Sequence, residues 1–122
     1  MAVSRDHTKL KVFALADELV VEVYRLTSKV PVEERYGLQA QIRRAAVSVP
    51  TNIVEGSART TTRDYVHFLV VALGSASEVR YLLKLASRLG FLPNSDATTL
   101  EHRYDELVRA LAALIRSLEA RS

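Results

Sequence analysis

Apolar residues recur with helical spacing in four separate segments of this chain, and no segment shows the strict alternation of a half-buried strand. The segments lie at roughly 9–29, 33–57, 62–89 and 95–120, and only 4 glycines and 3 prolines interrupt the 122 residues. Short connections between long helices favour antiparallel neighbours. The pattern therefore predicts an all-α protein, an up-down-up-down four-helix bundle that forms one domain over residues 1–122.

Local signals mark the ends of the helices. Val30 precedes Pro31 and should end the first helix, because the residue before a proline is pushed out of helical geometry. The other candidate boundaries are Thr61 or Thr62, with Asp64 in the first turn, for the start of the third helix, Gly90 for its end, and Asn94 or Ser95 for the start of the fourth.

The second helix contains a proline. Pro50 has no backbone N–H, so we expect a bend near Pro50 or a local break. Gly56 is the candidate end of this helix, and a severe break would leave a three-helix variant. The fourth helix carries a heptad-like seam with steps of three and four residues: Leu100, Tyr104, Leu107, Leu111, Leu114 and Leu118.

A polar stripe runs along the second helix, directly beside an apolar one. Its members are Gln41, Arg44, Ser48, Asn52, Glu55 and Arg59, and the apolar line is Leu38, Ile42, Ala45, Ala46, Val49 and Ile53. Steps of three and four keep each set on one face. The favoured interpretation is a structural hydrogen-bond network that fixes helix register or a subunit contact, in which Ser48 and Asn52 also satisfy carbonyls freed by Pro50. The alternative is a binding or catalytic constellation.

Carboxylates complete this stripe. Glu78 of the third helix is predicted to join the network by pairing with Arg43 or Arg44, because a half-buried carboxylate needs a cation. Glu55 and Glu78 are also the one plausible pair of buried carboxylates for acid–base chemistry.

The second and third helices have more apolar surface than a four-helix monomer can cover. Val47 and Val54 point away from the core line, and the third helix is apolar almost all round between Tyr65 and Ala76. The small residues Gly74–Ser77 would let another helix backbone approach closely. We therefore predict a homo-oligomer with these two helices in the interface; the alternative is a wide core stripe with scattered surface valines.

The chain is mildly basic, with a net charge of +3 and a pI near 9.4, which permits nucleic-acid binding without requiring it. The candidate contacts are Arg43, Arg44, Arg59 and Arg63. Arg59 and Arg63 flank three threonines at the start of the third helix, where free N–H groups could hold a phosphate; the alternative is an ordinary capped turn with solvated arginines. The candidates for base stacking are Tyr36, Tyr65 and Tyr81, although each could instead pack between helices.

Other classes of site lack the residues they need. Without cysteine there is no disulfide or thiolate metal site, and His7, His67 and His102 are far apart with no Glu-x-x-His pair, so we expect no metal and no cofactor. His67, in the apolar third helix, is expected to be a core or interface residue. The longest apolar stretch, Phe68–Leu73, is far below the roughly 20 residues of a membrane span. We expect a cytoplasmic protein without membrane contact.

Two strings in this order resemble the bacterial 23S ribosomal RNA intervening-sequence proteins: YGLQAQIRRAAVSVPTNIVEGSAR and DYVHFLVVALGSASEVRYLLKLASRLG. The opening KVFALADELVVEVYRLTSKVP is similar too, so the resemblance covers roughly Leu10 to Gly90. It departs at Ala16–Glu18, where the family often has an aromatic residue. The resemblance implies a four-helix bundle that assembles into a ring-like homo-oligomer, a pentamer among relatives, with no established catalytic activity.

The resemblance also suggests possible partners. Some members are encoded within intervening sequences of ribosomal RNA genes, and distant relatives are accessory proteins of diversity-generating retroelements that engage RNA and a reverse transcriptase. Together with the residues, this predicts a non-enzymatic oligomeric interaction protein that binds RNA or DNA through a basic surface. The alternative is a protein-binding scaffold or accessory subunit without nucleic-acid contact, and an enzyme is the third possibility.

Overall fold

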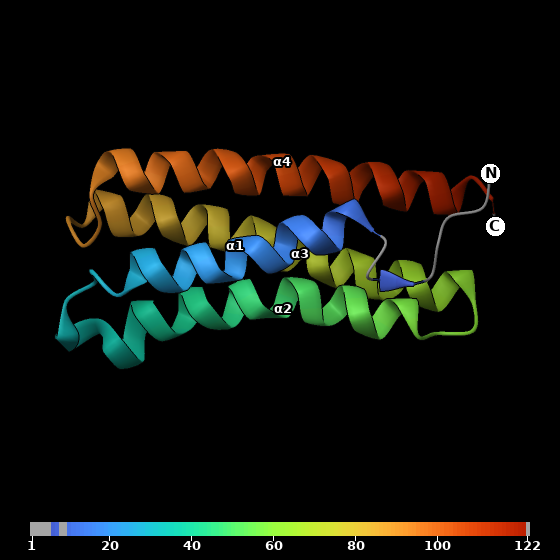
Figure 1. Cartoon of the computed structure of the whole chain (residues 1–122), viewed down its shortest axis with the longest axis horizontal. Helices are drawn as coiled ribbons and strands as arrows, with labels where there is room; N and C mark the ends of the chain where they lie inside the picture. Colours follow the sequence, from blue (N-terminus) through green and yellow to red (C-terminus); the bar gives the residue numbers. More distant parts are fainter. Residues whose placement is uncertain (1–5, 8–9, 122) are drawn as a thin grey trace.

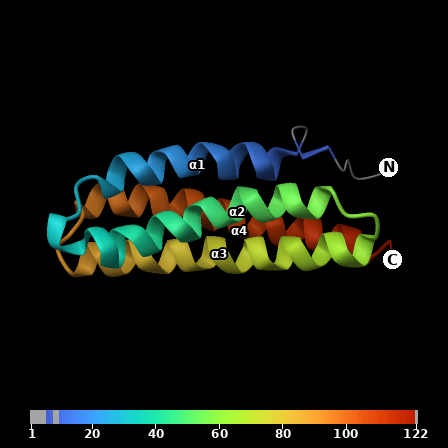
Figure 2. The ribbon, with the colours of Figure 1, turned by 90° about the horizontal axis from the view of Figure 1, so that it is seen from below.

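Four long helices pack into a bundle in the computed structural model, which describes residues 6–7 and 10–121 (Figure 1). They are α1 (Lys11–Thr27), α2 (Ala40–Ser57), α3 (Thr62–Arg88) and α4 (Asn94–Glu119). Successive helices alternate in direction, and both α1 and α3 pack against α2 and α4 (Figures 1 and 2). The all-α four-helix fold is confirmed and the three-helix variant is wrong. The predicted start of the first helix at residue 9 lies outside the described residues.

Each helix contributes one apolar stripe to a common core. Leu19, Ile42, Leu69 and Leu107, one from each helix, are fully buried. Burying a side chain of this size stabilises the fold by about 1.5–3 kcal/mol. The predicted seam of α4 faces this core, except that Leu114 is only partly buried and Ile115 is buried beside it.

The connection between α1 and α2 is longer than the sequence predicted. A 3₁₀ turn, Val32–Glu34, follows Pro31, and a π-type turn, Arg35–Gln39, follows that. Gly37 has non-helical backbone angles, φ −103° and ψ −107°, and regular α-helix begins only at Ala40. The expectation that the second helix starts near residue 33 is therefore wrong, because Gly37 interrupts the ladder of hydrogen bonds.

α2 stays helical through Pro50. The local break predicted there is wrong, and the bend stays a prediction. Two side chains next to the proline hydrogen-bond carbonyls one turn earlier: the Thr51 hydroxyl donates to the Val47 carbonyl at 2.7 Å, and the Asn52 amide donates to the Ser48 carbonyl at 2.8 Å. Pro50 leaves the carbonyl of Ala46, four residues earlier, without its usual N–H donor. The two bonds reach the next two carbonyls instead, so the expectation that Ser48 and Asn52 satisfy the freed carbonyl stays a prediction.

Gly56, near the end of α2, and Gly74, in the middle of α3, have opposite surroundings. A Cβ on Gly56 would lie 2.9 Å from the Phe68 Cβ and 3.2 Å from the Tyr65 carbonyl oxygen, whereas a Cβ on Gly74 would meet no atom within 4 Å. Gly56 lies one residue before the end of α2 at Ser57, close to the end predicted for this helix, and it lets α3 approach closely. Gly74, predicted to serve close packing, is exposed in the described bundle and serves no contact within it.

The ends of α3 follow the predicted signals. The Thr61 hydroxyl accepts a hydrogen bond from the Asp64 backbone N–H at 3.1 Å, which caps the N-terminus. Gly90 has a positive φ of 78°, and the Phe91 N–H donates to the Ala86 carbonyl at 2.9 Å. This is the arrangement of a Schellman motif, in which glycine is favoured because its φ is positive.

The start of α4 differs from the prediction. Pro93 occupies the N-cap position and no side chain caps the helix, so the expectation that Asn94 or Ser95 would do so is wrong. The Asn94 side-chain oxygen instead accepts a hydrogen bond from the Ser87 hydroxyl at 2.9 Å, which ties the turn to the end of α3.

Candidate interaction surface

A polar seam joins α2 to α3. It consists of Gln41, Ser48 and Asn52 from α2 and Ser75 and Glu78 from α3. The hydroxyls of Ser48 and Ser75 are 2.8 Å apart, and the Asn52 amide donates to the Ser48 hydroxyl oxygen at 3.0 Å. At the other end of the seam the Gln41 amide reaches the Glu78 carboxylate at 3.5 Å. Part of the polar stripe thus lies against α3 and fixes how the two helices align.

The charged members of the stripe do not enter this seam. Arg44 is exposed and makes no ion pair within the described residues, and the Glu55 carboxylate binds Arg59 at 3.1 Å. Glu55 and Glu78 are both exposed, so the expected pair of buried carboxylates is not formed.

Arg43 fastens the end of α1 to α2. Its Nε donates to the Thr27 hydroxyl at 2.9 Å, its Nη2 donates to the Tyr24 carbonyl at 3.1 Å, and its guanidinium carbon is 4.4 Å from the centre of the Tyr24 ring. The predicted pairing of Glu78 with Arg43 or Arg44 is wrong. Arg43 lies on the side of α2 that faces α1, whereas Glu78 comes from α3 on the opposite side.

The corner between α2 and α3 was the predicted phosphate site. Arg59, besides binding Glu55, stacks over the Phe68 ring at 4.7 Å. Thr61 caps the helix and Asp64 places a carboxylate in its first turn, so the chain itself supplies groups that the N-terminus favours. Both corner arginines are exposed. Arg59 pairs with Glu55, whereas Arg63 makes no ion pair in the described part of the chain.

Apolar side chains are exposed on the outer surfaces of α2 and α3. Val47 and Val54 of α2 are 40% and 37% exposed, and Val70 and Val71 of α3 are 49% and 39% exposed. We call these four valines, together with the exposed Gly74, the valine face. The most apolar window of α3 is only 33% buried, and among the described helices α3 alone is long and apolar enough to cross a membrane. The core helix of a soluble bundle meets the same criterion.

The histidines and tyrosines are divided between core and surface. His67, expected in the core or interface, is exposed and makes an edge contact with the Phe68 ring at 5.4 Å between centroids. Tyr65 is buried, which removes it from the stacking candidates, whereas Tyr36 and Tyr81 are 89% and 56% exposed. No group of three potential metal ligands occurs among the described residues.

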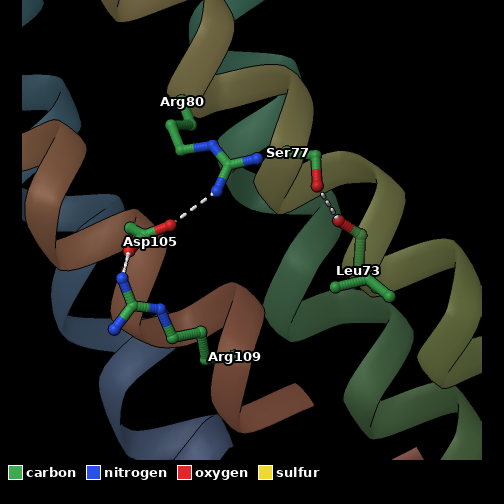
Figure 3. A network of polar contacts seen from close by, with 5 residues as sticks. All are labelled: Leu73, Ser77, Arg80, Asp105 and Arg109. Carbon is green, nitrogen blue, oxygen red and sulfur yellow. Dashed lines mark hydrogen bonds and ion pairs between the residues drawn. The ribbon is translucent and has the colours of Figure 1, made fainter. Parts of the chain in front are cut away.

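Two hollows of the surface were not predicted from the sequence. A cleft of about 340 Å³ lies between α1 and α4, where Lys29 pairs with Asp96 at 3.1 Å. A groove of about 410 Å³ lies between α3 and α4, beside the pair formed by Arg80 and Asp105 at 2.7 Å (Figure 3). Opposite charges in the sequence hint at such pairs, but which charges meet depends on the alignment of helices far apart in the chain.

The comparisons with known proteins agree with this fold. Residues 8–113 match the model of a family described as 23S rRNA-intervening sequence protein. A crystal structure of a protein with unknown function from the S23 ribosomal protein family of Bacteroides thetaiotaomicron superposes with a TM-score of 0.79, at 24% sequence identity, over 86% of this chain and 95% of that one. At that identity the likeness concerns the fold alone. The search of curated proteins found no match.

Proposed function

Because the chain belongs to the 23S rRNA-intervening sequence protein family, whose name specifies no activity, we propose that it is a non-enzymatic cytoplasmic interaction protein that self-associates. The surface we assign to self-association is the valine face of α2 and α3. The observation that carries the proposal is Gly74, a glycine inside a long helix at which an added Cβ would meet no atom within 4 Å.

Two energetic arguments support this use of the valine face. A glycine within a helix costs about 0.5–1 kcal/mol relative to alanine, and no contact inside the bundle compensates for it at Gly74. A helix from a second copy that packs closely against Gly74 would compensate. The same contact would cover Val70 and Val71, and covering apolar surface contributes roughly 25 cal/mol per Å².

The polar groups near the valine face suit the rim of an interface. Arg44 and Glu55 are exposed charges of opposite sign on α2, and Ser48 and Asn52 are half-buried beside them. Protein interfaces commonly surround an apolar centre with such a polar rim. The number of copies that we propose, five, follows from the resemblance described above.

Sedimentation velocity at micromolar concentration tests self-association. We expect a species heavier than the 13.6 kDa monomer, and we expect Val71→Asp to convert it to monomer, because a charge in an apolar contact is left unpaired. Val21→Asp is the matched control, since Val21 is 48% exposed on α1, outside the valine face. Sedimentation of the unaltered chain as a monomer at every concentration defeats the proposal.

We also propose that the assembled protein binds RNA or DNA through Arg44 and Arg63. This second candidate is favoured by the exposure of these two arginines without ion pairs in the described residues, whereas Arg43 and Arg59 are engaged. Repetition of the same charges in every copy of an assembly adds up to a stronger field.

Mobility shift of a labelled structured RNA at two salt concentrations tests the nucleic-acid proposal. Binding should weaken as salt rises, because phosphate contacts release counterions, and the double variant Arg44→Ala, Arg63→Ala should weaken it further. Arg116→Ala, an exposed arginine of α4, is the control. Absence of binding at low salt by a protein that still self-associates would favour the protein-binding scaffold instead. Turnover that Glu55→Gln abolishes would contradict the non-enzymatic assignment.

A further inference from the structure

The groove between α3 and α4 differs from the valine face in chemistry and position. Its walls carry ionisable, hydroxyl and aromatic groups: Ser77, Arg80, Tyr81 and Lys84 from α3 and Glu101, His102 and Asp105 from α4. Its volume of about 410 Å³ is within the range of small-molecule sites, about 300–1,000 Å³. The groove lies on the α4 side of α3, whereas the polar seam lies on the α2 side.

Asp105 lines the groove and is shared by two guanidinium groups, that of Arg80 on the groove wall and that of Arg109 one turn further along α4, outside the lining. Arg80 Nη1 is 2.7 Å from one oxygen of Asp105, and Arg109 binds the other oxygen through its Nη2 (Figure 3). Two cations around one anion leave a net positive charge. Each guanidinium has five N–H donors, so the bonds to Asp105 leave donors free for a second anion. Guanidinium forks match the oxygens of a phosphate well.

A further cation stands one turn along α3. Lys84 lines the groove, is exposed, and makes no ion pair within the part of the chain that the structure describes. Glu101 on the facing wall is the one acid of the groove besides Asp105. Among the lining residues Arg80 and Lys84 balance Glu101 and Asp105. Arg109, which binds Asp105 from outside the lining, adds the positive charge that favours an anionic ligand over a cationic one.

An aromatic ring lies beside these cations. Tyr81 follows Arg80 in the chain, is 56% exposed and lines the groove. The ring pairs found among the described residues, His7–Phe13 and His67–Phe68, do not involve Tyr81, so its exposed ring is available to a flat ligand. Nucleobases stack on such exposed rings with little regard to base identity. His102 from α4 adds a donor or acceptor on the opposite wall.

We propose that the α3–α4 groove binds a nucleoside phosphate, with the base stacked on Tyr81 and the phosphate held by Lys84 and the guanidiniums of Arg80 and Arg109. The ligand chemistry is the same for a free mononucleotide and for one unit of a single strand. The proposal does not depend on self-association, and it assigns contacts separate from Arg44 and Arg63.

Titration of the full chain with adenosine 5′-monophosphate and with a fluorescein-labelled octa-adenylate, at low salt, tests the groove. Tyr81→Leu should weaken binding of the occupying form at least about fivefold, because it removes stacking and keeps an apolar side chain. The affinity for the octa-adenylate falls as salt rises, and Lys84→Gln should make the slope of log affinity against log salt shallower by about 0.7. The controls are Tyr36→Leu, at another exposed tyrosine, and Arg116→Gln, at another exposed arginine of α4.

The two ligands separate the two sources. Binding of the monophosphate that depends on Tyr81 supports a mononucleotide site, and dependence seen with the octa-adenylate alone supports a strand. Absence of binding by both probes, or binding that Tyr81→Leu and Lys84→Gln leave unchanged, overturns the inference. If the Arg44 and Arg63 variant abolishes octa-adenylate binding and the groove variants do not, the nucleic-acid proposal stands and the groove proposal falls. Sedimentation of the groove variants should match that of the unaltered chain.

Discussion

Alanine at Gly56 and alanine at Gly74 should change the stability of this protein in opposite directions. Both glycines lie within helices, Gly74 in the middle of α3 and Gly56 in the last turn of α2, so alanine brings a gain in helix propensity of up to about 1 kcal/mol at each. The surroundings differ. The added methyl group at Gly74 meets nothing within 4 Å, whereas at Gly56 it meets Phe68 Cβ at 2.9 Å and a Tyr65 ring carbon at 3.0 Å.

The net effects follow from these contacts. Gly74→Ala should stabilise the monomer by about 0.5–1 kcal/mol, since propensity acts alone. At Gly56 the close atoms belong to the base of a side chain, a packed ring and the Tyr65 backbone oxygen at 3.2 Å, which cannot move without shifting α3. Overpacking of this kind costs about 1–3 kcal/mol. After the gain in propensity, Gly56→Ala should destabilise by up to about 2 kcal/mol.

Urea unfolding followed by circular dichroism measures both changes. The transitions should be compared at a protein concentration where every variant sediments as a monomer, because self-association raises apparent stability. The unfolding midpoint should rise for Gly74→Ala and fall for Gly56→Ala, at an unchanged m-value. Equal shifts of both midpoints in the same direction would refute the packing argument. At higher concentration Gly74→Leu should reduce self-association if a neighbouring copy packs against this position.

Three further substitutions and one pH dependence follow from the contacts. The buried Tyr104 hydroxyl has no hydrogen-bond partner among the described residues, so Tyr104→Phe should raise the free energy of unfolding by about 1 kcal/mol in urea titrations. Burial raises the pKa of Tyr104 above its ordinary value of 10.0, so as the pH rises the unfolded state loses the phenol proton before the folded state does. The free energy of unfolding should therefore fall above pH 10, and it should fall less in Tyr104→Phe. Arg43→Ala should cost about 1–2 kcal/mol, measured by the same titration, because it removes the bonds from α2 to the Thr27 hydroxyl and the Tyr24 carbonyl. Asn52→Ala should lower the melting temperature and weaken self-association, whereas a residue that only binds a ligand would leave both unchanged.

The helices were predictable because their signals are local. Periodicity placed α3 and α4 to within a residue at each end, and Gly90 and Thr61 act as their spacing indicated. The start of α2 was missed, because the non-helical geometry of Gly37 gives no clear signal beside Leu38 and Ile42, which continue the apolar line. A glycine can end a helix or lie inside it, and the chain alone does not distinguish these cases.

The pairing of polar side chains was harder to predict. Ser48 and Asn52 lie on the face expected of them, but Arg43 is one residue away from Arg44 and therefore points toward a different helix. A rotation of about 100° per residue separates the two. The choice between α1 and α3 as the neighbour of each side is made by the packing of the whole bundle, which no short segment specifies.

The neighbours of α1 have a consequence for the order in which the bundle opens. Every other packed pair of helices is also consecutive in the chain, whereas α1 meets α4 across most of the sequence, and charged pairs such as Lys29–Asp96 and Arg103–Glu18 lie on that junction. Closing a long loop costs entropy before its contacts form. α1 also packs less extensively against its neighbours than α3 does. In native-state hydrogen exchange, the amides of α1 should therefore be the first helical amides to lose protection, while the α2–α3–α4 unit stays folded.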